Sequence, residues 1–330
     1  MKIILFIIVI FVILLIVTEI SAFSFIFNKY RVEFLPFEKK GILKHYVVMK
    51  NLKQEDLTSV LRQVEYRNPN KRPLVIFGGS HAWGHDLPVD ETFSRKLADR
   101  TNRTVVNRAK CSEGPAFMYY QLANKDITEK IKSLFTPPPH GNITQDTDNT
   151  INKDAEYVIY VNISGHNIRN LKYRNHINEP FFSVRYKLKN NELIEDKVSF
   201  PKLHSLYMFA LIEKCIDNIN LKNNDYINEV YEKLILESAE LACKEFPNSK
   251  FAVVIMPDGK ADIRDDIERP QLRMWERIQE ELGQEKITII DVQKELSLED
   301  SEKYWLPDNS HPTAQAWDEI VPIIIRKLNL

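Results

Sequence analysis

The stretch of residues 72–84 constrains the fold of this chain more than any other part of the sequence. Its apolar run, residues 74–77, lies between a proline and a pair of glycines, a pattern that predicts a buried strand with a sharp exit. Ser80 follows the glycines, where the strand leads into a helix, so its hydroxyl can project from the carboxyl edge of a sheet. Ligand crevices of open α/β sheets lie at that edge.

The alternation of strand and helix continues to the end of the chain. Apolar runs predict further strands at residues 104–107, 157–163, 251–257 and 287–290, and helical spacing predicts helices at 91–103, 117–123, 226–246, 270–282 and 313–328. Pro322 should kink or split the last of these helices. Strands that alternate with helices indicate an α/β fold with a mostly parallel sheet covered on both faces.

The amino-terminal residues form a separate segment. Residues 3–17 are uninterruptedly apolar after Lys2, and residues 23–27 resume the apolar run. One interpretation is a signal peptide with Ser21 and Ala22 near the cleavage point; the other is an uncleaved transmembrane anchor, which needs about 20 apolar residues. The apolar core is long for a signal peptide, which favours the anchor. We therefore expect a membrane-anchored protein whose main domain is extracytoplasmic, or a secreted one if the segment is cleaved.

The sequence divides into three parts. They are the anchor or signal peptide at 1–27, a linker with a covering helix at 28–70, and the main domain at 71–330 with an insertion at about 175–245. The covering helix is expected at residues 52–66 from the spacing of its apolar side chains. Within the insertion, residues 181–188 and 192–200 alternate loosely around Asn190-Asn191, which predicts a β-hairpin.

Charge and cysteine usage narrow the classes of function. A net charge of −1 does not suggest a nucleic-acid partner, since such domains usually carry a basic face. The chain has 3 cysteines, which is no disulfide framework, and their spacing resembles no zinc site. We expect no metal and no other cofactor.

A serine hydroxyl is a weak nucleophile and needs a base within hydrogen-bond reach. Asp308 precedes His311 by three residues near the end of the chain, so one loop can carry both. The carboxylate could accept the Nδ1 proton of the imidazole, which leaves Nε2 free to take the proton of Ser80. The order Ser80, Asp308, His311 therefore predicts a catalytic triad.

These segments resemble the SGNH hydrolases, also called the GDSL esterase and lipase superfamily, in a bacterial branch that uses Gly-Gly-Ser. Gly79 stands where many members carry an aspartate. The resemblance covers residues 74–170 and about the last forty. It implies a three-layer α/β/α, flavodoxin-like sheet, a carboxylic ester hydrolase or O-acyltransferase activity, and a triad of Ser80, His311 and Asp308.

The resemblance also implies donors for an oxyanion hole. The backbone N–H of Ser80 is one. The second motif of the superfamily follows the second strand and supplies another N–H; Ser112 matches that position best, with Gly114 two residues on. The third motif places an asparagine side chain there, which Asn167 matches, and an offset of one residue would put His166 in its place.

The expected function is a serine esterase that removes O-acyl groups, such as acetyl, from an extracytoplasmic carbohydrate or lipid. One alternative is an O-acetyltransferase acting on cell-envelope polysaccharide. An alternative of another class is a non-catalytic carbohydrate-binding envelope protein, supported by Gly79 and Ser112 in place of the usual residues. His81 and His85 follow the nucleophile and lie four residues apart, which would place them on one face of a helix, as two metal ligands could lie. No third metal ligand is evident, so we expect these histidines to be solvated or to contact substrate.

Overall fold

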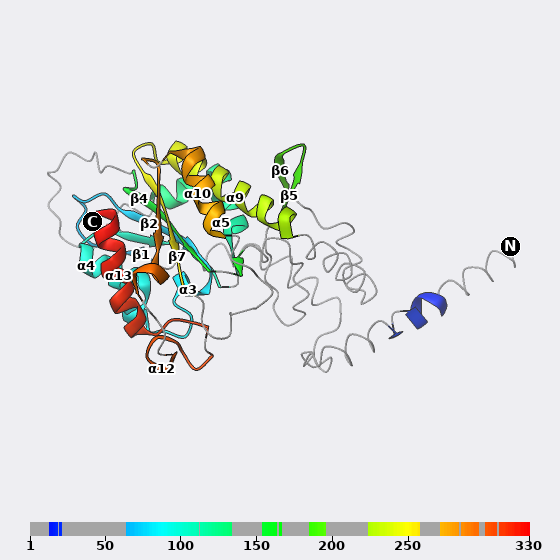
Figure 1. The fold of residues 1–330 in the computed structure, drawn as a ribbon, viewed down its shortest axis with the longest axis horizontal. Helices are drawn as coiled ribbons and strands as arrows, with labels where there is room; N and C mark the ends of the chain where they lie inside the picture. The colour runs from blue at the N-terminus through cyan, green and yellow to red at the C-terminus, as the bar shows by residue number, and fades with distance from the viewer. Residues whose placement is uncertain are drawn as a thin grey trace, which may run out of the picture.

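The computed structural model describes residues 13–18, 20–21, 64–111, 113–133, 154–163, 165–166, 185–195, 224–257, 271–283, 285–296, 301–308 and 310–330. Within these residues, a six-stranded sheet has the order β1-β3-β2-β4-β7-β8 (Figure 1). Its strands are β1 (Val64–Glu65), β2 (Leu74–Gly78), β3 (Val105–Asn107), β4 (Tyr157–Asn162), β7 (Lys250–Ile255) and β8 (Ile287–Asp291). All neighbouring strands pair in parallel except β1, which is antiparallel to β3. The predicted mostly parallel sheet is confirmed.

Helices cover both faces of the sheet. They are α3 (Ser80–Trp83), α4 (Phe93–Thr101), α5 (Pro115–Ala123), α6 (Lys125–Ser133), α9 (Asn224–Glu245), α10 (Gln271–Leu282), α11 (Val292–Glu295), α12 (Ser301–Tyr304) and α13 (Ala314–Leu328), with a 3-10 turn η1 (Val89–Glu91). Alternate strand residues point to opposite sides, so Ile76 packs with α4 and α13 while Phe77 packs with the layer formed by α5, α9 and α10. Figure 1 shows these two helical layers on either side of the strands. The three-layer arrangement expected from the sequence is present.

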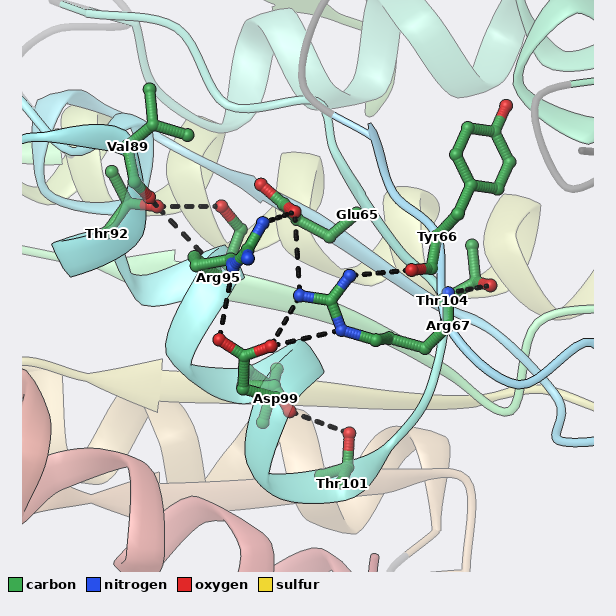
Figure 2. Close-up of polar contacts among 11 residues, drawn as sticks. Glu65, Tyr66, Arg67, Val89, Thr92, Arg95, Asp99, Thr101 and Thr104 are labelled. Carbon is green, nitrogen blue, oxygen red and sulfur yellow. Dashed lines mark hydrogen bonds and ion pairs between the residues drawn. The ribbon is translucent and has the colours of Figure 1, made fainter. Parts of the chain in front are cut away.

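The edge strand β1 corrects the prediction of a helix over residues 52–66. Val64 and Glu65 pair with β3 instead of continuing a helix, because the open edge of β3 offers backbone partners and Val64 is β-branched. Charged side chains fix this strand to α4: Arg95 lies between Glu65 and Asp99, with Nη1 at 2.9 Å from Glu65 Oε2 and Nε at 3.1 Å from Asp99 Oδ2 (Figure 2). The remainder of the predicted helix lies outside the described residues.

Helix α13 runs through Pro322 without being split, contrary to one of the two expected outcomes. Pro322 lies on the exposed face of the helix and has no N–H to give to the carbonyl of Asp318. That carbonyl instead accepts a hydrogen bond from Arg100 Nη1 of α4 at 2.9 Å. The neighbouring helix thus satisfies the acceptor that the proline leaves unpaired.

The predicted hairpin is confirmed as β5 (Tyr186–Lys189) and β6 (Glu192–Glu195), an antiparallel pair. Asn190 and Asn191 form its turn with φ of 53° and 64°, which asparagine tolerates better than most residues. The end of the predicted insertion at 175–245 forms α9, which packs on the central sheet. That range therefore includes a helix of the main fold as well as the hairpin.

The predicted anchor or signal peptide at residues 1–27 lies largely outside the described residues. Residues 13–18 and 20–21 are helical and exposed. In the described parts of the chain, no helix combines the length and the apolar character needed to cross a membrane.

Candidate active site

Ser80 begins helix α3 directly after strand β2, where a tight turn brings the backbone against β4. Gly78 has φ of +154°, and a Cβ atom there would lie 2.9 Å from the carbonyl oxygen of Val161. Gly79 is the N-cap of α3 in an extended conformation. Gly78 therefore allows the chain to pass close to β4, and Ser80 lies at the carboxyl edge of the sheet with an exposed fraction of 7%.

Backbone hydrogen bonds join the two ends of the loop between α12 and α13. Trp305 and Pro312 form an isolated antiparallel bridge, and the N–H of Leu306 donates to the carbonyl of His311 at 2.7 Å. Inside the loop, Asp308 Oδ1 accepts hydrogen bonds from the backbone N–H groups of Ser310 and His311, each at 3.0 Å. Aspartate side chains commonly stabilise turns by accepting hydrogen bonds from backbone N–H groups two or three residues later. Here these bonds fix the carboxylate beside the imidazole.

In the structure, Ser80, His311 and Asp308 lie next to one another. His311 Nε2 lies 2.7 Å from Ser80 Oγ, and His311 Nδ1 is hydrogen-bonded to Asp308 Oδ2. Burial raises the pKa of the Asp308 carboxyl, but the hydrogen bonds from His311 and the Ser310 backbone outweigh it and lower that pKa to about 2. The ionised carboxylate accepts the Nδ1 proton, so the tautomer of a neutral His311 leaves Nε2 free to accept from the Ser80 hydroxyl.

The two histidines that follow the nucleophile differ in how far they are buried. His81 is buried, with an exposed fraction of 3%, so the expectation that it is solvated is wrong. Its Nε2 lies 2.7 Å from the carbonyl oxygen of Ser310. The His85 side chain is 43% exposed, and its ring centroid lies 4.6 Å from that of His311. Within the described part of the chain, no group of three or more His, Cys, Asp or Glu side chains could hold a metal ion.

The expected oxyanion donors are only partly described. Gly114 is buried and caps helix α5, whereas Ser112 and Asn167 lie outside the described residues. The backbone N–H of Ser80 lies in the first turn of its helix, where it has no intrahelical acceptor. His166 is fully buried, and its Nδ1 lies 2.6 Å from Tyr160 Oη, in the core layer beneath α9.

A buried arginine that the sequence did not single out anchors the loop after β3. Arg108 has an exposed fraction of 1%, and its Nε donates to Gln121 Oε1 on α5 at 2.8 Å. Burial lowers the pKa of this guanidinium to about 10. Its backbone N–H also donates to Ile76 of β2 at 2.7 Å, which holds the loop beside the strand that carries Ser80. An arginine after a strand usually indicates an exposed loop, so the sequence carries no signal for this role.

Comparisons with known proteins give similarity in structure only. No family model matches the sequence, and no curated protein matches it at a significant level. Similar solved structures include a member of the lipolytic G-D-S-L family from Veillonella parvula, at 11% identity and a TM-score of 0.43, covering 78% of this chain and 97% of that one. The psychrotrophic esterase EstA from Pseudoalteromonas sp. gives 10% identity, a TM-score of 0.43 and coverage of 78% and 97%.

A third similar structure is a carbohydrate esterase family 2 enzyme with a carbohydrate-binding domain from Corynascus thermopiles (Myceliophthora fergusii). It gives 12% identity and a TM-score of 0.41, and covers 81% of this chain and 69% of that one. All three identities are low and the TM-scores fall below 0.5, so these structures assign no activity to this chain.

Proposed function

We propose that this protein is a serine hydrolase of carboxylic esters with Ser80 as nucleophile, His311 as general base and Asp308 as the group that orients the base. The observation that supports this proposal is the 2.7 Å separation of Ser80 Oγ and His311 Nε2, with a carboxylate bonded to the opposite nitrogen of the ring. A nucleophile, a base and an orienting group in hydrogen-bond contact are the arrangement that activates a hydroxyl.

In the proposed first step, Ser80 Oγ attacks the ester carbonyl carbon while His311 Nε2 takes its proton. The resulting imidazolium lies against the ionised Asp308, whose low pKa keeps it charged at neutral pH. Collapse of the tetrahedral intermediate breaks the ester C–O bond, and His311 returns the proton to the departing alcohol. Water then attacks the acyl group on Ser80 by the same route, which releases the acid and restores the hydroxyl.

The tetrahedral intermediate carries a negative oxygen that needs donors close by. We assign this role to the backbone N–H of Ser80, together with Ser112 or Gly114 and with Asn167, or His166 in its place. The contact of His166 with Tyr160 favours Asn167 over His166, because it occupies one ring nitrogen in the core. Loss of one such donor typically lowers the rate by about 10²- to 10³-fold.

The proposed substrate is an O-acyl ester, such as an acetyl group, of a carbohydrate or lipid outside the cytoplasm. The apolar residues 3–17 support this location, because such a run is typical of a segment that directs a chain to the membrane or across it. Acetate release from an O-acetylated glycan, compared with fatty-acid release from a lipid ester, tests the substrate class. If added glycan acceptor diverts acetate into a new glycan ester, the protein is a transferase.

Replacing Ser80 by Ala tests the nucleophile. We expect the variant to lose hydrolysis of p-nitrophenyl acetate and covalent labelling by a fluorophosphonate probe. Ser238→Ala is the matched control, because Ser238 is also a buried serine and lies on α9, in a helical layer of the fold away from Ser80. Turnover and labelling that persist in the Ser80 variant would rule out the nucleophile. A wild-type protein that neither turns over the ester nor reacts with the probe would indicate a non-catalytic binding protein.

A further inference from the structure

The loop of residues 305–312, which carries His311 and Asp308, is joined to helix α3 at two points. Among the described residues, two hydrogen bonds connect them: His311 Nε2 with Ser80 Oγ, and His81 Nε2 with the carbonyl oxygen of Ser310, both at 2.7 Å. The first bond has to break and re-form in each proposed catalytic cycle, because its proton is transferred. The second involves neither reacting atom and can persist throughout the cycle.

The chemistry of the second bond is unambiguous. A backbone carbonyl oxygen can only accept, so His81 Nε2 must carry a proton and donate it. The ring is 3% exposed, so water cannot readily replace this bond. The ring also lies edge-on to Trp305, with centroids 6.5 Å apart and planes inclined by 65°. Since Trp305 pairs with Pro312, His81 contacts the loop both near its closing bridge and at the residue before His311.

We propose that His81 is a positioning residue that holds His311 over Ser80 by donating to the Ser310 carbonyl. This inference rests on the proposed roles of Ser80 and His311. Ser80 and His81 are successive residues of α3, so the nucleophile and the donor move as one unit. Ser310 and His311 are likewise successive, so the acceptor and the base move together. The fixed bond between one pair therefore sets the geometry of the reacting bond between the other.

Two replacements of similar size to histidine separate the effect of losing the hydrogen-bond donor from the effect of changing the side-chain volume. The amide nitrogen of His81→Gln reaches about as far as the imidazole Nε2 and can still donate, whereas the thioether of His81→Met cannot. We expect kcat for p-nitrophenyl acetate to fall by roughly 10²-fold in the Met variant with little change in KM, since misplacing a base by about 1 Å has this effect. The Gln variant should stay within about threefold of wild type.

Tyr157→Phe is the matched control for loss of a buried hydrogen bond. Tyr157 Oη donates to the carbonyl of Leu328 at 3.0 Å, again between a buried side chain and a distant backbone oxygen. Tyr157 begins β4, at the opposite edge of the sheet from Ser80. This variant should lose thermal stability and keep kcat, which would show that destabilisation alone does not reproduce the effect of His81→Met.

A second readout does not depend on turnover. The proton shared by His311 Nδ1 and Asp308 should give a low-field ¹H resonance in the full-length wild-type protein, in His81→Gln and in Tyr157→Phe. It should broaden or disappear in His81→Met, because a released loop opens that bond to water. His81→Asn, whose amide is too short to reach Ser310, replaces the Met variant if the latter does not fold.

The outcomes are distinct. Reduced kcat with unchanged KM and loss of the resonance in the Met or Asn variant, with both retained in Gln, supports the positioning role. An unchanged kcat and an unchanged resonance in the variants that lack the donor overturn it. If the wild type and Ser80→Ala are equally inactive, the proposed function fails, and the resonance alone decides whether His81 fixes the loop.

Discussion

Replacing Asp308 by Asn removes the charge behind His311 and keeps much of the loop that carries it. The Asn side-chain oxygen can still accept the backbone N–H groups of Ser310 and His311, as Asp308 Oδ1 does at 3.0 Å. The changed contact is the one with His311 Nδ1. An amide nitrogen in the place of Oδ2 donates to Nδ1, which moves the ring proton to Nε2 and leaves no acceptor for the Ser80 hydroxyl.

The expected fall in kcat for Asp308→Asn depends on how exposed the carboxylate is to solvent. In a deeply buried triad this substitution lowers kcat by about 10⁴-fold. The Asp308 side chain is 41% exposed, so water can partly replace the lost charge and we expect a smaller fall. Our expectation is a decrease of roughly 10²- to 10³-fold in kcat, or about 3–4 kcal/mol of transition-state stabilisation. KM should change little, because the lost interaction strengthens only as the imidazolium forms.

The assay is the steady-state hydrolysis of p-nitrophenyl acetate, with the rate of fluorophosphonate labelling as an independent measure of Ser80 reactivity. Asp318→Asn is the control: its side chain is 47% exposed and pairs with Lys96 and Arg100 on the helical layer of α4 and α13. It should leave kcat unchanged. An Asp308→Asn enzyme with kcat within about threefold of wild type would show that His311 does not depend on this carboxylate, and the triad would be refuted.

Three further predictions follow from described contacts. The pKa of Asp308 is lowered from 3.8 to about 2, so its contribution to stability is complete above pH 3.8 and is lost as the pH falls toward 2; Asp308→Asn should flatten acid unfolding followed by circular dichroism across that interval. Trp317 is fully buried and stacks on Phe93 with centroids 4.7 Å apart, so Trp317→Ala should cost about 3–5 kcal/mol in urea unfolding; a smaller loss would show that the site collapses. Cys111 Sγ lies 3.8 Å from Nδ1 of His85, whose ring lies next to that of His311. Alkylation of Cys111 by N-ethylmaleimide, mapped by mass spectrometry, should therefore inhibit hydrolysis, whereas a Cys111→Ser enzyme should resist inhibition. Equal inhibition of both enzymes would exclude the thiol as the cause.

Much of the fold could be predicted because parallel strands bury both faces. The strands that contain Ile76, Ile159 and Val253 are continuous apolar runs, which little else in a chain of this kind can produce. Ser80 was predictable for the same reason, since a residue directly after a parallel strand lies at the carboxyl edge. Asp308 and His311 were predictable from their spacing, because residues three positions apart in one turn can bring their side chains into contact.

What the sequence did not predict depends on partners far along the chain. Val64 continues a helical spacing, and only the open edge of β3, some forty residues later, makes it a strand. Pro322 breaks isolated helices, but Arg100 satisfies the carbonyl that it leaves free. His81 resembles a solvated histidine until the loop at Ser310 covers it. In each case a contact that no local pattern encodes overrides the local preference.

The order of the strands also bears on the proposed role of His81 in holding the base near the nucleophile. The chain leaves the sheet at β8, and β2, which leads to Ser80, is three strands away, or about 14 Å at the usual spacing between strands. His311 therefore lies three strand positions away from β8 in the order of the sheet, on the side where α13 packs beside α4. The hydrogen bond between His311 and Ser80 breaks in every proposed turnover, so at that moment it does not hold the base in place. The Asp308 turn, the bridge between Trp305 and Pro312 and the His81 donor each remove freedom from this segment, and if one of them is dispensable for kcat, the remaining two must be sufficient to fix the imidazole.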